Sequence, residues 1–164
     1  MKFNNGNNGM IVIGDLVLDR DTAYYATMNT SGNMINMPGY SHPKVAIYDQ
    51  EGSIPHFHIY DKNPKTTPPK LDVAIKVHIN QYFNHGSHQG VLSDTKQRRF
   101  LNAWLHQQNH EMPELTNWQR MVYEWNKTPY PGKLLFPNGF IQPEYFKILP
   151  RDDSVDSKLL IPCR

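Results

Sequence analysis

The chain has 164 residues, of which 38% are hydrophobic, 12% aromatic and 20% charged, so it is long enough for one globular domain with a hydrophobic core. Its 13 prolines and 10 glycines exclude a collagen-like or disordered composition, and its formal net charge of +2 lies below the strongly basic range of dedicated nucleic-acid-binding domains. The eight histidines are the unusual feature of this composition.

The cellular compartment is indicated by the single cysteine and by the N-terminus. Cys163 cannot form an intramolecular disulfide, which favours a reducing compartment. Residues 1–9 are rich in Asn and Gly and lack the apolar stretch of a signal peptide, and no run approaches the roughly 18 apolar residues of a membrane span. We therefore expect a cytoplasmic protein, or part of a phage particle assembled in the cytoplasm, without membrane contact.

The first half of the chain carries the patterns of β-strands. Residues 11–18 have apolar side chains on both faces, and residues 19–43 form a long connection rich in Gly, Pro, Asn and Ser. Residues 44–49 and 54–60 are spaced as an antiparallel hairpin. Residues 71–79 alternate strictly between apolar and polar side chains, which predicts a strand with one buried and one wet face.

Two amphipathic helices are predicted to follow. Ser93 or Asp94 can cap the first, which should end near Asn109, and Thr116 can cap the second in a capping box with Gln119. Apolar residues recur at helical spacing in both, and we interpret them as core: Phe100, Leu101, Trp104 and Leu105, then Trp118, Met121, Val122 and Trp125.

The C-terminal segment, residues 128–164, holds six of the 13 prolines and should form an extended arm. Its large aromatic side chains are costly to leave in water, so they must cover either this domain or another chain. The predicted partner-binding residues are Tyr130, Phe136, Phe140, Tyr145 and Phe146. The fold class expected from these patterns is α+β: a small, mostly antiparallel sheet of about four strands with two helices on one face. The single domain would span residues 11–127, between arms of residues 1–10 and 128–164.

Five of the eight histidines lie close together in the sequence, namely His56, His58, His78, His85 and His88. Alternation along the predicted strands places His56, His58 and Tyr60 on one face, together with Lys76 and His78, if the strands pair with their core faces aligned. His85 and His88 lie on a turn after the strand. The sequence therefore predicts a polar, solvent-exposed sheet face that carries several imidazoles.

Three kinds of chemistry use such a cluster, and the sequence leaves them open. Neutral imidazoles bind zinc or another divalent metal, which could activate water in a metal-dependent hydrolase or nuclease-like enzyme. Histidines can also act on a phosphate, although Tyr60 stands where a third alternating histidine would be needed. Neighbouring imidazoles can sense pH because they repel one another when protonated. The simplest alternative is that these histidines make ordinary hydrogen bonds.

Other candidate residues carry weaker signals. Lys96, Arg98 and Arg99 form a basic run that could bind phosphates or nucleic acid, although it lacks the interleaved aromatic residues of a single-strand binder. A solvated helical face explains this run more simply. His106 and His110 have the spacing of a helical metal site, but the helix macrodipole also favours histidine near a C-terminus.

The stretch Ile54-Pro55-His56-Phe57-His58-Ile59-Tyr60, the strand after it and the tryptophan-bearing helices resemble a small bacterial and phage domain family of uncharacterised function. That family has a Pro-His-aromatic-His strand motif and often occurs in operons resembling toxin and antitoxin pairs. The likeness covers roughly residues 44–126. It implies a role for His56 and His58 without implying an activity.

These observations favour a non-enzymatic accessory protein of a bacterium or phage, which docks on a protein partner or self-assembles through its arms. The alternative is the metal-dependent enzyme, with His56, His58 and His78 as ligands and His85 or His88 completing the site. A third hypothesis is a regulatory, antitoxin-like binder.

Overall fold

The computed structural model describes residues 10–19, 21, 34–40, 42–48, 55–61, 70–76, 81–84, 95–137, 147–149 and 161–162. Within these ranges, the side chains of residues 61, 70–76, 81–84, 147–149 and 161–162 are not described. The expected α+β class is confirmed, with a mostly antiparallel sheet and two helices in the second half of the chain. In the described part of the chain, no helix is long and apolar enough to span a membrane.

The main sheet has six strands rather than about four. Their order is β1 (Met10–Asp15), β4 (Pro43–Tyr48), β5 (His56–Asp61), β6 (Lys70–Lys76), β7 (Gln81–Asn84) and β9 (Lys147–Leu149). All neighbours are antiparallel except β7 and β9. The extra edge strand β9 comes from the predicted C-terminal arm, because three residues without proline suffice for an edge strand.

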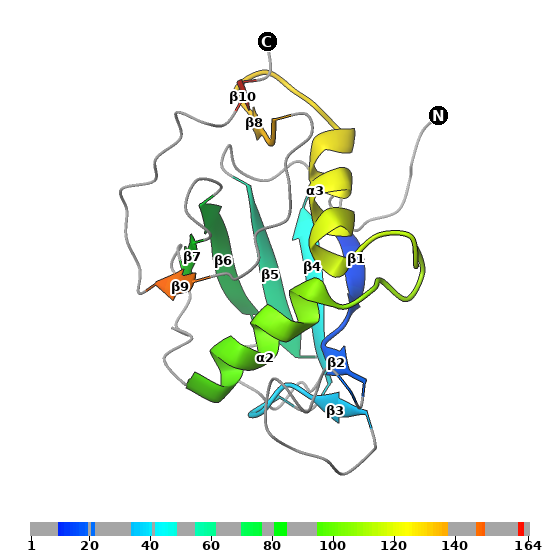
Figure 1. Ribbon diagram of the computed structural model, residues 1–164. Helices are drawn as coiled ribbons and strands as arrows, with labels where there is room; N and C mark the ends of the chain where they lie inside the picture. Colours follow the sequence, from blue (N-terminus) through cyan, green and yellow to red (C-terminus); the bar gives the residue numbers. More distant parts are fainter. Residues whose placement is uncertain are drawn as a thin grey trace.

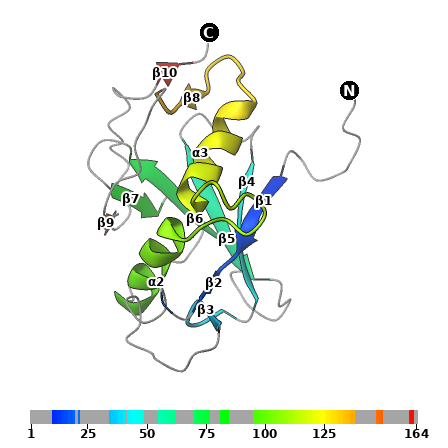
Figure 2. The same cartoon turned by 45° about the vertical axis from the view of Figure 1, so that its right-hand side comes forward.

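Two small antiparallel sheets lie at opposite ends of the molecule (Figure 1). One joins β2 (Val17–Leu18) to β3 (Ile35–Asn36), and the other joins β8 (Leu134–Leu135) to β10 (Ile161–Pro162). The helices α2 (Thr95–His106) and α3 (Asn117–Lys127) lie on one side of the main sheet, as both views show (Figures 1 and 2).

The core lies between the helices and the sheet. Register pairs Gly14 with Val45 and Val45 with Ile59, so these residues share a sheet face. A Cβ atom at Gly14 would lie 3.9 Å from the ring of Trp104, which places α2 over this face. Seven of the eight predicted helical apolar residues are buried and Val122 is partly buried, and all of them pack in one cluster with the strand residues. Its largest members are Trp104, Trp118, Trp125, Phe57, Phe100 and Phe136.

The second helix begins with the predicted capping box. The hydroxyl of Thr116 accepts a hydrogen bond from the backbone N–H of Gln119 at 3.2 Å, and the Gln119 side chain accepts one from the backbone N–H of Thr116 at 2.9 Å. Both donors belong to the first turn, where no intrahelical acceptor exists, so the box defines the start of α3.

The predicted strand of residues 11–18 is interrupted. Register slips between Val12 and Gly14, which leaves Ile13 as the extra residue of a β-bulge. Leu16 then separates β1 from β2, and its backbone N–H donates to the carbonyl of Pro43 at 2.9 Å. A bulge bends a strand, and here the chain leaves the main sheet to pair with β3 instead.

Side chains from α2 and the loop after it cover the edge of β1. The Asn109 amide donates to the carbonyl of Ile13 at 2.9 Å, and the Trp104 indole donates to the carbonyl of Asp15 at 2.8 Å. An open strand edge invites pairing with another chain, and these two bonds satisfy outward carbonyls of β1. The loop therefore fixes the helices to the sheet as well as joining them.

The segment after α3 packs first against its own domain. Lys133 is fully buried, and its ammonium donates to the carbonyls of Trp125 at 2.6 Å and Thr128 at 3.0 Å, at the C-terminal end of the helix. The same ammonium lies 4.4 Å from the ring centre of Trp125 and 5.3 Å from that of Tyr130. Lys133 thus satisfies carbonyls that the end of a helix leaves without an intrahelical donor.

The prediction that Phe136 binds a partner does not agree with its burial. It is 1% exposed and packs edge-on against Trp118, with ring centres 5.6 Å apart. Asn126 bonds to both the carbonyl and the N–H of Phe136. This aromatic residue covers its own core, so it is not available to another chain. Tyr130 is half-buried, while Phe140, Tyr145 and Phe146 lie outside the described residues.

Candidate functional site

His56 and His58 share a face of β5, as their spacing predicts, and their rings pack against each other. The ring centres are 4.9 Å apart with an angle of 75° between the planes. Tyr48 lies edge-on to His58 at 4.7 Å, and Trp125 lies edge-on to His56 at 5.5 Å. The pair is therefore part of an aromatic cluster that links β4, β5 and α3.

The expected solvent exposure of this face is wrong for both histidines. His56 is 5% exposed and His58 is 1% exposed, and the Nε2 atom of His58 is inaccessible to solvent. The alternate residues Phe57 and Ile59 are also buried, so β5 is covered on both faces. Strands of this kind lie in the middle of a sheet, and β5 has a partner strand on each side.

The register of β5 and β6 shows which other residues have positions on this face. His58 is opposite Asp72 and Tyr60 is opposite Lys70, so Lys76 occupies a position of the same face on β6. The strand ends at Lys76, and His78, His85 and His88 lie outside the described residues. Among the residues that the structure does describe, no three His, Cys, Asp or Glu side chains form a group suited to a metal. The five-histidine zinc site therefore remains a prediction.

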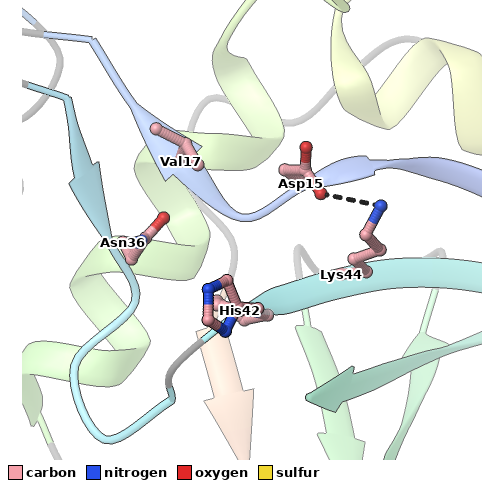
Figure 3. A pocket seen from close by; sticks show the side chains of 6 residues that line it. Asp15, Val17, Asn36, His42 and Lys44 are labelled. Atoms are coloured by element: carbon pink, nitrogen blue, oxygen red, sulfur yellow. Dashed lines mark ion pairs between the residues drawn. The ribbon is translucent and has the colours of Figure 1, made fainter. Parts of the chain in front are cut away.

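A hollow at the opposite end of the sheet brings together polar residues that the sequence did not connect. Its volume is about 330 Å³, and its walls are Asp15, Val17, Asn36, His42, Pro43 and Lys44 (Figure 3). The Lys44 ammonium forms an ion pair with the Asp15 carboxylate at 3.1 Å. The sequence does not predict that His42 lies here, because the hollow is formed by segments that are far apart in the chain.

Tyr60 extends this ion pair into a row across three strands. Asp15 pairs in register with Lys44, and Lys44 pairs with Tyr60. Burial raises the pKa of the Tyr60 hydroxyl above its usual 10.0; the Lys44 ammonium lowers this pKa and the Asp15 carboxylate raises it. Both charges are therefore close enough to act on the phenol.

Only part of the basic run lies on the outer surface of α2. Lys96 and Arg99 are exposed, and Arg98 is half-buried, with its guanidinium donating to the Thr95 hydroxyl at 3.2 Å. His106 is also exposed, and its Nδ1 atom lies 2.8 Å from the carbonyl of Asn102. The helix contains no acidic residue. The apolar side chains on its inner face, Phe100, Leu101, Trp104 and Leu105, are at most 1% exposed. The basic residues therefore belong to a helix that is packed firmly on the core.

The sequence patterns do not predict a polar network that lies between the helices. Arg120 is 7% exposed; its guanidinium donates to Glu124 at 3.0 Å, to Glu111 at 3.1 Å and to the Asn109 side chain at 3.0 Å. The Asn117 amide donates to the carbonyl of Trp104 at 2.7 Å. The one available signal was the i, i+4 spacing of Arg120 and Glu124, which is too common to predict burial.

Comparisons with models of protein families, with curated proteins and with solved structures found no match. The resemblance to the Pro-His-aromatic-His family therefore stays a prediction from the sequence.

Proposed function

We propose that this chain is a non-enzymatic interaction protein that docks on an acidic partner protein through the basic face of α2, defined by the exposed Lys96 and Arg99 with the half-buried Arg98 at its edge. The observation that carries this proposal is the position of these cations. They occupy the N-terminal half of α2, where the helix macrodipole is positive and each cation in the first turn costs roughly 0.3–1 kcal/mol. Helix stability does not explain such an arrangement, whereas attraction of a negative surface does.

Several other polar groups in the described residues serve the fold. The Arg120 network joins the helices, Lys133 bonds to carbonyls at the end of α3, and His56 packs on His58. The basic face of α2 differs because Lys96 and Arg99 point outward from a helix whose other side is buried. A rigid, charged surface can steer and orient a partner without a large change of shape.

The described tryptophans favour a protein over a single-stranded nucleic acid as the partner. Base stacking requires exposed aromatic rings, but Trp104, Trp118 and Trp125 are each 1% exposed. Tyr123, which is 49% exposed, lies on α3, and the ammonium of Lys127 is 5.8 Å from its ring centre. The net charge of +2 is also modest for a protein that binds a phosphate backbone.

The proposal is tested with two labelled polyanions, poly-L-glutamate and a random-sequence duplex DNA, by fluorescence anisotropy at low and physiological salt. We expect saturable binding of poly-L-glutamate, weakened about tenfold or more when Lys96, Arg98 and Arg99 are all replaced by Gln. Lys127→Gln is the matched control, since Lys127 is 58% exposed on the neighbouring helix. Tighter binding of DNA would overturn the choice of a protein partner, and equal binding by the triple variant would overturn the docking surface.

A further inference from the structure

The hollow beside β1 is built from three segments that backbone hydrogen bonds hold in place. The N–H of Leu16 donates to the carbonyl of Pro43 at 2.9 Å, and the N–H of Met37 donates to the carbonyl of Leu16 at 3.2 Å. Val17 and Asn36 are partners in the small sheet of β2 and β3. The walls are therefore positioned by the main chain, as in a preformed ligand site.

The two charged groups of the ion pair in this hollow differ in their exposure to solvent. The Lys44 side chain is 23% exposed and the Asp15 side chain is 62% exposed, so the positive end is the more enclosed one. Figure 3 shows the two side chains pointing toward each other along one side of the hollow. A ligand with only a negative charge would be repelled by Asp15, and one with only a positive charge would be repelled by Lys44. A ligand that carries both charges avoids both repulsions.

We propose that the hollow binds a small zwitterion of the α-amino-acid class, with its carboxylate on Lys44 and its ammonium on Asp15. The four charges then alternate in sign, so the ligand joins the existing ion pair without having to break it. The volume of about 330 Å³ lies at the lower end of the range for small-molecule sites. Val17 and Pro43 supply apolar walls for the ligand side chain.

Two further polar side chains line the hollow. They are the His42 ring and the Asn36 amide, which both carry hydrogen-bonding nitrogen atoms. Tyr60 does not line the hollow, but it is next to Lys44 in register on β5. Asp15 is the one acidic residue among those that line the hollow, which restricts the ammonium to the exposed end.

The test uses three related compounds with different charged groups: L-alanine, N-acetyl-L-alanine without the ammonium, and L-alaninamide without the carboxylate. Each is titrated into the ¹⁵N-labelled full chain while the amide chemical shifts are followed. We expect saturable shifts at Asp15, Val17 and Lys44 with L-alanine, and affinities about tenfold or more weaker for the other two compounds.

Two variants make the assignment of the charges falsifiable. Asp15→Asn should remove the preference for L-alanine over N-acetyl-L-alanine, and Lys44→Met should remove its preference over L-alaninamide. Asp15 is exposed enough for its variant to fold even if Lys44→Met does not. Equal shifts with all three compounds, no saturable shift with L-alanine, or an unchanged preference in Asp15→Asn would each overturn the proposal. Because α2 contributes no wall, these results do not depend on the proposed docking function.

Discussion

Asn109→Ala tests the inference that the loop after α2 fixes the helices to the sheet. Asn109 is 1% exposed, and its amide donates to the Ile13 carbonyl and to the Asn117 side chain, both at 2.9 Å. Its side-chain oxygen accepts from the Arg120 guanidinium at 3.0 Å and from the backbone N–H groups of Glu111 at 3.2 Å and Met112 at 3.0 Å.

The expected loss of stability follows from these contacts. The bonds to Ile13, Asn117 and Arg120 are buried and contribute about 1 kcal/mol each, whereas water can replace the two bonds to the partly buried loop N–H groups. The substitution should therefore lower the free energy of unfolding by about 3 kcal/mol, a large share of the roughly 5–15 kcal/mol of an ordinary domain.

Urea denaturation measures this loss as a lower midpoint with an unchanged slope. Glu114→Ala is the matched control, because Glu114 lies in the same loop, is exposed and should change the free energy of unfolding by less than about 0.5 kcal/mol. If Asn109→Ala were as stable as this control, the loop would not hold the helices on β1 and the reasoning would be refuted.

Three further predictions concern Phe136, the histidine pair and Tyr60. Phe136→Ala should cost about 3–5 kcal/mol of stability in dilute protein, whereas a residue that only contacts a partner would leave the denaturation midpoint unchanged. The double variant His56→Ala, His58→Ala should be less stable than the wild type both with and without a chelator. Its metal content, measured by mass spectrometry, should equal that of the wild type. Loss of bound zinc on mutation would instead favour the metal-dependent enzyme. Because burial raises the folded-state pKa of Tyr60 above 10.0, its contribution to stability is full below about pH 10 and is lost as pH rises through the folded-state pKa. Wild type should therefore lose stability relative to Tyr60→Phe above about pH 10, and parallel curves would contradict this.

Local chemistry explains why the helices were predictable from the sequence. Thr116 and Gln119 identify the start of α3, and the tryptophans at helical spacing identify its buried face. The first helix ends at His106, three residues before Asn109, because Asn109 bonds to β1 instead of continuing the helix. That contact joins residues 96 positions apart, which no local pattern contains.

The candidate sites depend on the same kind of distant contact. Alternation predicted that His56 and His58 share a face, but burial of that face depends on what packs over a central strand, and period-two patterns do not contain this information. The hollow combines Asp15, Asn36 and Lys44, which become neighbours only when β1 bends at its bulge and β2 pairs with β3. The basic run of α2 was visible in the sequence, and the structure adds that two of its side chains are exposed.

The central claim is that the basic face of α2 docks on an acidic protein surface, and carbodiimide cross-linking to a glutamate-rich peptide tests it most directly. This reagent joins a lysine amine to a carboxylate in contact with it, and peptide mapping identifies the lysine. Lys96 should carry most of the cross-link, the exposed Lys127 much less, and the fully buried Lys133 none. Equal or greater labelling of Lys127 than of Lys96 would contradict the account.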